Sequence, residues 1–159
     1  MGNDAMARRK ATDMPAGSGS GYPPPHDARC QGREWHTLGD AFGLTQFGVK
    51  LLRLKPGVWS SQRHWHSHED EFVYMLEGEA TLVTDAGEEA FCAGDCVGFK
   101  AGVKDGHCIQ NNSDSDAVML VMGSRDDRDF GDYPDIDMKF WPGRYSAPAR
   151  WTRKDGSDF

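Results

Sequence analysis

The sequence predicts an all-β protein, a sandwich or a barrel of short strands. From about residue 35 of the 159 residues, short apolar stretches recur, and each is followed by turn residues. The 19 glycines and 8 prolines supply many of these turns. No segment of about eleven residues or more shows a convincing helical period. Many short strands joined by hairpin turns are typical of sandwiches and barrels.

The expected strands lie where apolar and polar residues alternate, or where apolar residues run together between turns. They cover residues 47–54, 58–66, 71–76, 80–84, 89–92, 96–99, 107–110 and 117–122. The last of these is the most continuously apolar run, which is typical of a buried strand. Turns are expected around Gly78, Gly87 and Gly94.

Composition divides the chain into three regions. Residues 1–32 are rich in Gly, Ser, Pro, Asp and Arg, and we expect a flexible leader there, disordered or extended, or one ordered late on a partner subunit. Residues 33–142 are expected to form the barrel and residues 143–159 a C-terminal extension. Residues 133–142 are expected either to close one end of the barrel or to line its pocket.

The charge argues against nucleic acid as a partner. The formal net charge is -7, and the acidic residues are spread along the chain. A nucleic-acid-binding surface needs a basic stripe, and the basic cluster Arg8-Arg9-Lys10 lies in the leader. No apolar run approaches the roughly 18 residues that a membrane span needs, and no secretory signal is visible. We therefore expect a cytoplasmic protein with no nucleic-acid or membrane partner.

The four cysteines, Cys30, Cys92, Cys96 and Cys108, show no paired spacing of the zinc-ribbon type. Cys92 and Cys96 are close enough in sequence to hold a metal, but a strand and its adjacent turn explain both as buried small hydrophobes. The expectation is a reducing compartment with free thiols.

A pair of histidines carries the clearest chemical signal. Side chains in the expected strand 58–66 alternate between two faces, so His64 and His66 point to one face and Trp65 to the other. Two imidazoles that are two residues apart on the same face of a strand can bind one metal ion together, because neutral imidazole is a common ligand. The alternatives are an exposed pair or two core histidines with ordinary hydrogen-bond partners.

Two further candidates follow the histidine pair. Glu71, in the next expected strand, is either a third ligand or a solvated acid beside Glu69 and Asp70. His107 comes after a further strand pair and a Gly-rich loop, in a short strand that ends at Asn111.

The stretch that contains Gly57, the pair His64 and His66, Glu71 and Gly78 resembles the first motif of the cupin superfamily. The spacing from the pair through Glu71 to Gly78 agrees with that motif, whereas one extra residue separates Gly57 from His64. The two motifs are loose individually and strong together, in order, in an all-β chain.

The stretch Gly94, Gly102, His107 and Asn111 resembles the second cupin motif. Lys100 stands where that motif has proline, and two extra residues separate Gly102 from His107. The step from His107 to Asn111 is kept. A loop absorbs extra residues without moving the strand behind it, so the departures leave His107 a candidate.

The resemblance covers about residues 43–124, and the segments HWH, EDEF and YPDID are similar to those of a group of single-domain bacterial cupins. It implies a double-stranded β-helix, or jelly-roll barrel, with one divalent metal ion held by His64, His66, Glu71 and His107. Such a mixed N/O set suits Fe, Mn, Ni, Cu or Zn. We also expect a homodimer, because an exposed barrel edge and a Pro-rich leader invite strand exchange between subunits.

Two residues share the strand parity of the histidine pair and are weak catalytic candidates. His68 is a spare ligand or a proton shuttle, or else an exposed side chain at the end of the strand. Gln62 donates a hydrogen bond to a substrate, or else fills the barrel in the ordinary way.

The first functional hypothesis is a metal-dependent enzyme that acts on a small organic molecule, because open metal positions polarise an oxygen, activate water or bind O2. Dioxygenase, isomerase, lyase and decarboxylase chemistries all occur on such barrels, and the fold does not choose among them. The second hypothesis is a non-catalytic barrel that binds or senses a small ligand. The third is a structural barrel that has histidines without metal.

Overall fold

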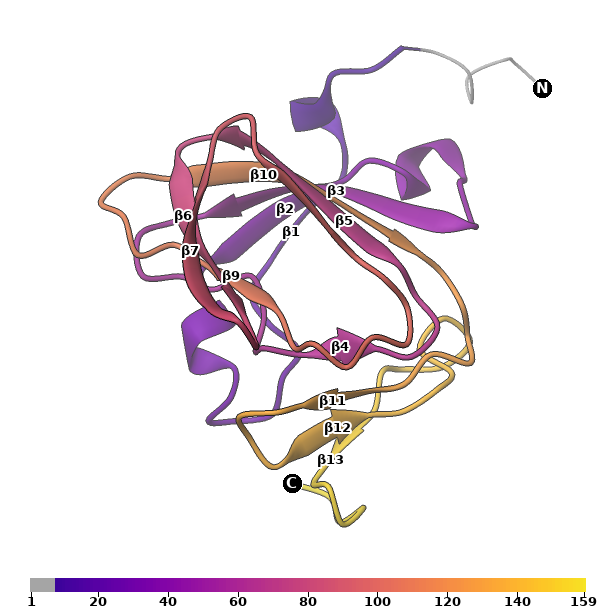
Figure 1. The fold of residues 1–159 in the computed structure, drawn as a ribbon. Coiled ribbons are helices and arrows are strands. Elements are labelled where there is room, and N and C mark those ends of the chain that lie inside the picture. The colour runs from indigo at the N-terminus through magenta and orange to yellow at the C-terminus, as the bar shows by residue number, and fades with distance from the viewer. Residues whose placement is uncertain (1–7) are drawn as a thin grey trace, which may run out of the picture.

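Strands dominate the computed structural model, which describes residues 8–159 (Figure 1). The strands are β1 (Ala16–Ser18), β2 (Arg33–Thr37), β3 (Phe47–Leu54), β4 (Trp65–His66), β5 (Glu71–Glu77), β6 (Glu79–Thr84), β7 (Gly87–Cys92), β8 (Cys96–Phe99), β9 (Cys108–Gln110), β10 (Ala117–Ser124), β11 (Gly131–Tyr133), β12 (Met138–Phe140) and β13 (Trp151–Thr152). The short 3-10 helices are η2 (Ala11–Asp13), η3 (Ala28–Cys30) and η4 (Asp40–Phe42). None of the helices in residues 8–159 has the length and apolar character needed to cross a membrane. The all-β prediction is confirmed.

Hydrogen bonds join the strands into sheets that roll up into a barrel. The order in the six-stranded sheet is β1-β2-β3-β10-β5-β8, in the four-stranded sheet β13-β12-β11-β4, and in the three-stranded sheet β7-β6-β9. Figure 1 shows β6, β7 and β9 at one side of the barrel, and β11, β12 and β13 as a layer beside β4. Because neighbours such as β3 and β10 are far apart in sequence, the chain crosses between the walls as in a jelly roll.

Alternation along the central strands directs one row of side chains into the barrel. In β5, Val73 and Met75 are buried, whereas Phe72, Tyr74 and Leu76 are exposed. The same alternation in the other strands assembles one main core. That core consists of Leu52, Leu54, Val73, Met75, Ala80, Leu82, Phe91, Ile109, Ala117 and Met119.

The expected strand 58–66 is wrong as a continuous strand, because only β4 is regular within it. The remainder makes single bridges with the segment that contains β9. These bridges are Trp59 to Gln110 and His64 to His107. More residues separate the bridge positions in the first segment than in the second, so residues 60–63 bulge out of the sheet. The strict parity expected from Gln62 to His68 is therefore broken at its start.

Segments outside the cupin-like stretch pack on the barrel. In the predicted leader, β1 pairs with β2, and Met14 and Cys30 are buried. In the predicted C-terminal extension, β13 pairs with β12, and Thr152 is fully buried. A second core cluster joins Tyr133, Met138 and Phe140 to Tyr22, Ile136 and Trp151. The three-region division stays a prediction, and residues 1–7 of the leader lie outside the described residues. The amino-acid composition of these segments indicates only how flexible each one is locally, so it could not reveal their contacts with distant parts of the chain.

All four cysteines are free thiols, as expected. Cys30 and Cys108 are buried, and burial raises the pKa of each thiol to about 11. The expectation that Cys92 and Cys96 are both buried is wrong for Cys96, which is exposed. The cause is its register: Cys96 lies opposite Tyr74, on the outward row of the sheet.

Gly78 and Gly57 provide a matched test of the turn between β5 and β6. Their φ angles are 78° and 81°, but a Cβ at Gly78 would overlap the carbonyl oxygen of Asp116, whereas Gly57 faces open space. The left-handed conformation costs a non-glycine residue about 1–2 kcal/mol, so Gly57→Ala should lose about that much stability. Gly78→Ala should lose about 1–3 kcal/mol more, because of the overlap. Urea unfolding measures both, and equal losses would contradict the steric argument.

Candidate metal centre

Four side chains from separate segments meet inside the barrel. His64 lies at the bridge opposite His107, His66 lies in β4, and Glu71 begins β5. One ligand atom each from His64, His66 and Glu71 lie within 4.8 Å of one another. His107 joins this group through Glu71, since its Nε2 lies 2.7 Å from Glu71 Oε2. The structure therefore brings together all four residues that the sequence analysis named.

Hydrogen bonds at Nδ1 orient the imidazole rings of His64 and His66. His64 Nδ1 lies 2.8 Å from the carbonyl oxygen of Gln62, and His66 Nδ1 lies 2.6 Å from Asp129 Oδ2. A carbonyl oxygen and an ionised carboxylate only accept hydrogen bonds, so each Nδ1 carries a hydrogen and donates it. In the neutral rings, each Nε2 then presents a lone pair to the interior.

The inward-facing nitrogens crowd one another. Nε2 of His64 and Nε2 of His66 are 3.1 Å apart, and Glu71 Oε2 lies 3.8 Å and 3.3 Å from them. Two lone pairs at hydrogen-bond distance repel each other unless a proton or a metal ion lies between them. A set of imidazole nitrogens and one carboxylate oxygen is a common donor set for transition metals. A divalent cation therefore fits these residues.

Burial and neighbouring charges set the protonation of the cluster. Burial lowers the pKa of His64 to about 3. For Glu71, burial acts to raise the pKa, but the hydrogen bond from His107 and the charges of the histidines outweigh it and hold the pKa well below its usual range. For His66, burial acts to lower the pKa, but the hydrogen bond to Asp129 outweighs it and the pKa is raised. A proton therefore competes with a cation at Nε2 of His66.

A buried charge network behind His66 was missed by the sequence analysis. Asp129 is fully buried, and it accepts hydrogen bonds from His66 and, at 2.9 Å, from the backbone N–H of His68. Arg144 Nη2 lies 3.1 Å from Asp129 Oδ2 and also contacts Glu69, which is 3% exposed. His66, Glu69 and Asp129 are close enough to hold an ion, but the guanidinium of Arg144 already neutralises them. Asp129 therefore orients the His66 ring.

The sequence offered little to single out this network. Asp129 ends the polar run Asp126-Asp127-Arg128-Asp129, in which its neighbours have the same acidic character. Arg144 lies in the predicted C-terminal extension, where a long-range contact with β4 has no local pattern.

The cluster lines a cavity of about 480 Å³, which is a suitable size for a small organic molecule. His64, His66, Glu71 and His107 all line it. Tyr133 and Phe140 also line it, so the segment 133–142 contributes to the pocket wall. Phe99 stacks on the His107 ring with a centroid distance of 3.5 Å.

Neither weak catalytic candidate lines this cavity. Gln62 lies in the bulge, and its side-chain amide donates to the carbonyl oxygen of His26 at 2.7 Å. His68 is exposed, and its Nδ1 lies 2.8 Å from Ser67 Oγ. The bulge and the short length of β4 remove the common orientation that strict strand parity predicted.

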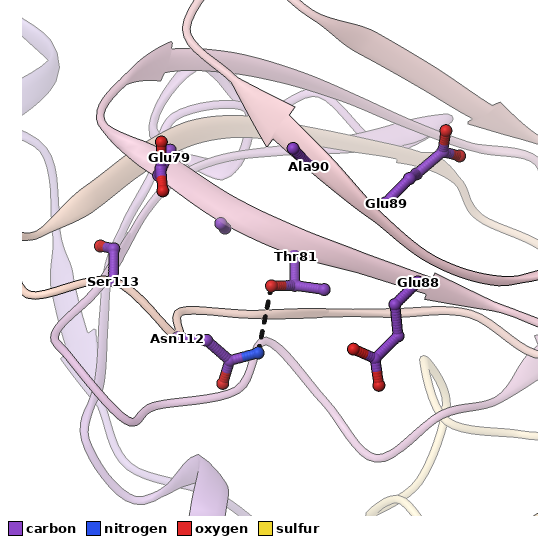
Figure 2. Close-up of a pocket in the computed structure, with 8 residues that line it drawn as sticks. Glu79, Thr81, Glu88, Glu89, Ala90, Asn112 and Ser113 are labelled. Atoms are coloured by element: carbon purple, nitrogen blue, oxygen red, sulfur yellow. Dashed lines mark hydrogen bonds between the residues drawn. The ribbon is translucent and has the colours of Figure 1, made fainter.

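A second cavity, of about 320 Å³, lies on β6 and β7 (Figure 2). Figure 2 shows Thr81 on the strand beside Asn112 of the opposite loop, whose amide donates to Thr81 Oγ1 at 3.1 Å. Its other lining residues include Glu79, Glu88 and Glu89, all exposed, and none of its lining residues is a histidine or a cysteine. This second cavity therefore lacks the imidazole ligands that line the first.

Comparisons with known proteins agree with the barrel fold. The model of the cupin domain family matches residues 50–123. The chain is similar to a solved structure of a sugar phosphate isomerase from a cupin superfamily, from Silicibacter pomeroyi, with 41% identity over 96% of each chain and a TM-score of 0.91. It is also similar to a candidate sugar phosphate isomerase from Acidithiobacillus ferrooxidans, with 32% identity over 78% of each chain and a TM-score of 0.71.

More distant similarity concerns the fold alone. The polyketide cyclase RemF from Streptomyces resistomycificus has 20% identity and a TM-score of 0.60, over 75% of this chain and 79% of that chain. No curated protein matches this chain.

Replacement of Arg144 tests the buried charge network. Arg144→Met leaves the carboxylates of Glu69 and Asp129 buried without their cation, so we expect a loss of about 3 kcal/mol in the free energy of unfolding. Arg150→Met removes an exposed pair with Asp158 and should cost less than about 1 kcal/mol. Urea denaturation measures both variants. Similar losses for both would show that the network contributes little beyond a surface ion pair.

Proposed function

Since this chain belongs to the cupin superfamily, we propose that it is a metal-dependent isomerase of a small phosphorylated sugar. Its single divalent ion is held by His64, His66, Glu71 and His107. The observation that carries this proposal is the 3.1 Å approach of two inward-facing imidazole nitrogens beside a carboxylate. The isomerase class and the phosphorylated sugar are supported by the similarity to the Silicibacter pomeroyi protein.

The residues of the proposed site have different roles. Three imidazole nitrogens and one carboxylate oxygen would hold the ion and leave positions open for a substrate. A bound divalent ion supplies Lewis-acid polarisation of a carbonyl or hydroxyl oxygen. Asp129 keeps His66 in the tautomer with a free Nε2, and Phe99 fixes the plane of the His107 ring. The donor set accepts Fe, Mn, Ni, Cu or Zn.

Metal content tests the site directly. Protein purified without added ions should contain about one divalent metal per chain, measured by inductively coupled plasma mass spectrometry, and the double variant His64→Ala, His66→Ala should contain almost none. The control His26→Ala removes a histidine outside the cavity and should keep the metal. Unchanged metal content in the double variant would refute the ligand assignment.

Turnover tests the isomerase. In deuterium oxide, the metal-loaded protein should interconvert an aldose phosphate and its ketose phosphate, and NMR should show deuterium at the carbon that exchanges its hydrogen. Tight binding of every sugar phosphate in the panel without interconversion would refute the isomerase and favour a non-catalytic binding or sensing barrel. That result would not affect the proposed metal ligands.

We further propose a homodimer that forms through the outer face of the six-stranded sheet. Phe72, Tyr74 and Leu76 project outward from β5 and are 38%, 38% and 39% exposed. In register beside them on β10 lie Leu120 and Met122, so the apolar surface continues across strands. A contiguous apolar patch supports an interface, and a second copy presents the same patch in an isologous contact. The cytoplasmic location and the lack of nucleic-acid and membrane partners stay predictions.

A charge on this face tests the dimer. Multi-angle light scattering at micromolar concentration should give twice the chain mass for the wild type and a single chain mass for Tyr74→Glu, because an unpaired carboxylate in an apolar interface is costly. Val103→Glu places the same charge on an exposed loop residue away from the sheet and should remain dimeric. A wild-type protein with a single chain mass would reject the dimer.

A further inference from the structure

Lys50 interrupts the apolar row that β3 directs into the barrel. Leu52 and Leu54 on this row are core residues, and Lys50 lies on the same row, opposite Val121 of β10. Both Lys50 and Val121 line the cavity that contains the histidine cluster. An ammonium group on an interior row is costly in free energy unless it reaches water or an anion. Lys50 is exposed, so its ammonium reaches water, and it does so where it lines this cavity.

Arg33 of β2 reaches the same cavity. Its Nε donates to the carbonyl oxygen of Gly19 at 3.0 Å, and its Nη1 donates to the carbonyl oxygen of Ser60 at 2.8 Å. These bonds fix the guanidinium and leave Nη2 free to donate. The Arg33 guanidinium and the Lys50 ammonium both lie over the ring of Trp35, at 5.7 Å and 5.4 Å from its centroid. Both cations therefore contact one aromatic side chain, which lies between them in the register of β2 and β3.

The other cations of the cavity are already neutralised. Arg125 pairs with Asp40, and Arg144 pairs with Glu69 and Asp129. Arg33 and Lys50, in contrast, form no ion pair with any carboxylate of residues 8–159.

Most of the charged groups near Lys50 are positive. Burial, followed by the charge of Arg33, lowers the pKa of Lys50, and Arg125 and Arg144 act in the same direction. Asp40 acts in the opposite direction without reversing the shift. A bound anion would relieve this repulsion.

We propose that Arg33 and Lys50, held by Trp35, form the subsite for the phosphate group of the substrate. Two cations that line one cavity match the charge of a phosphate monoester dianion, whose several oxygens accept hydrogen bonds from Nη2 of Arg33 and Nζ of Lys50. A substrate held there has its carbon chain in the same cavity as the histidine cluster. This inference rests on the proposed function for its substrate, but its residues are independent of the metal ligands.

Inorganic phosphate is the probe for this subsite. Isothermal titration calorimetry at constant ionic strength, with chloride as background, compares the wild type with Lys50→Met and Lys104→Met. Lys104 is a matched control, because its ammonium also stacks on a tryptophan, at 5.5 Å from Trp65, but outside the cavity. Lys50→Met should raise the phosphate Kd about tenfold or more, the loss expected for one charge-assisted hydrogen bond, and Lys104→Met should leave it unchanged. Lys50→Arg should restore most of the affinity.

Metal depletion separates this subsite from the proposed function. Phosphate binding that survives chelation and depends on Lys50 supports the subsite, even if the protein fails the metal and turnover tests. Phosphate binding that disappears on chelation and is unaffected by Lys50→Met would overturn the subsite, because the anion then binds at the metal. No saturable phosphate binding by the wild type, equal weakening by both lysine variants, or acetate binding as tight as phosphate would also overturn it.

Discussion

Two imidazole nitrogens that face each other 3.1 Å apart inside the barrel are the constraint on which the site depends. Neither His64 nor His66 can turn away, because a carbonyl oxygen and the Asp129 carboxylate occupy their Nδ1 atoms. Asp129 is fully buried and needs the charge of Arg144 to be stable there. Arg144 in turn requires the C-terminal segment to fold against the barrel. The contacts that orient the two histidines thus extend from the centre of the barrel to the C-terminal segment.

The sequence predicted those strands and site residues that can be recognised from a local sequence pattern. Strands 47–54 and 71–76 were placed almost to the residue, because turn residues end both stretches and the first also alternates as a half-buried strand does. His64, His66 and Glu71 were found because they lie close together in sequence. His107 was assigned to the same ligand set through the cupin resemblance, since 36 residues separate it from Glu71. The bulge at 60–63, which removes Gln62 from the cavity, depends on a mismatch between two distant segments and has no local signature.

The cavity differs in charge from the rest of the molecule. The chain has a formal net charge of -7, yet Arg33 and Lys50 leave the cavity wall with positive charge that no carboxylate partner neutralises. Lys50 is visible in the sequence as a polar residue on an otherwise apolar row, but only the register with Val121 shows that this row faces a cavity. The positive charge of Arg33 and Lys50 would therefore attract an anionic substrate to this cavity. Metal ligands and cationic wall together favour a small molecule that has both a chelating end and an anionic end.

The central claim is that His64, His66, Glu71 and His107 share one metal ion. Anomalous difference maps from crystals of the purified protein, recorded above and below the absorption edges of the candidate metals, test it most directly. We predict one peak, within coordination distance of the three Nε2 atoms and a Glu71 oxygen, that disappears below the edge of a single element. A map without a peak there, in crystals where His64 and His66 remain in contact, would contradict it.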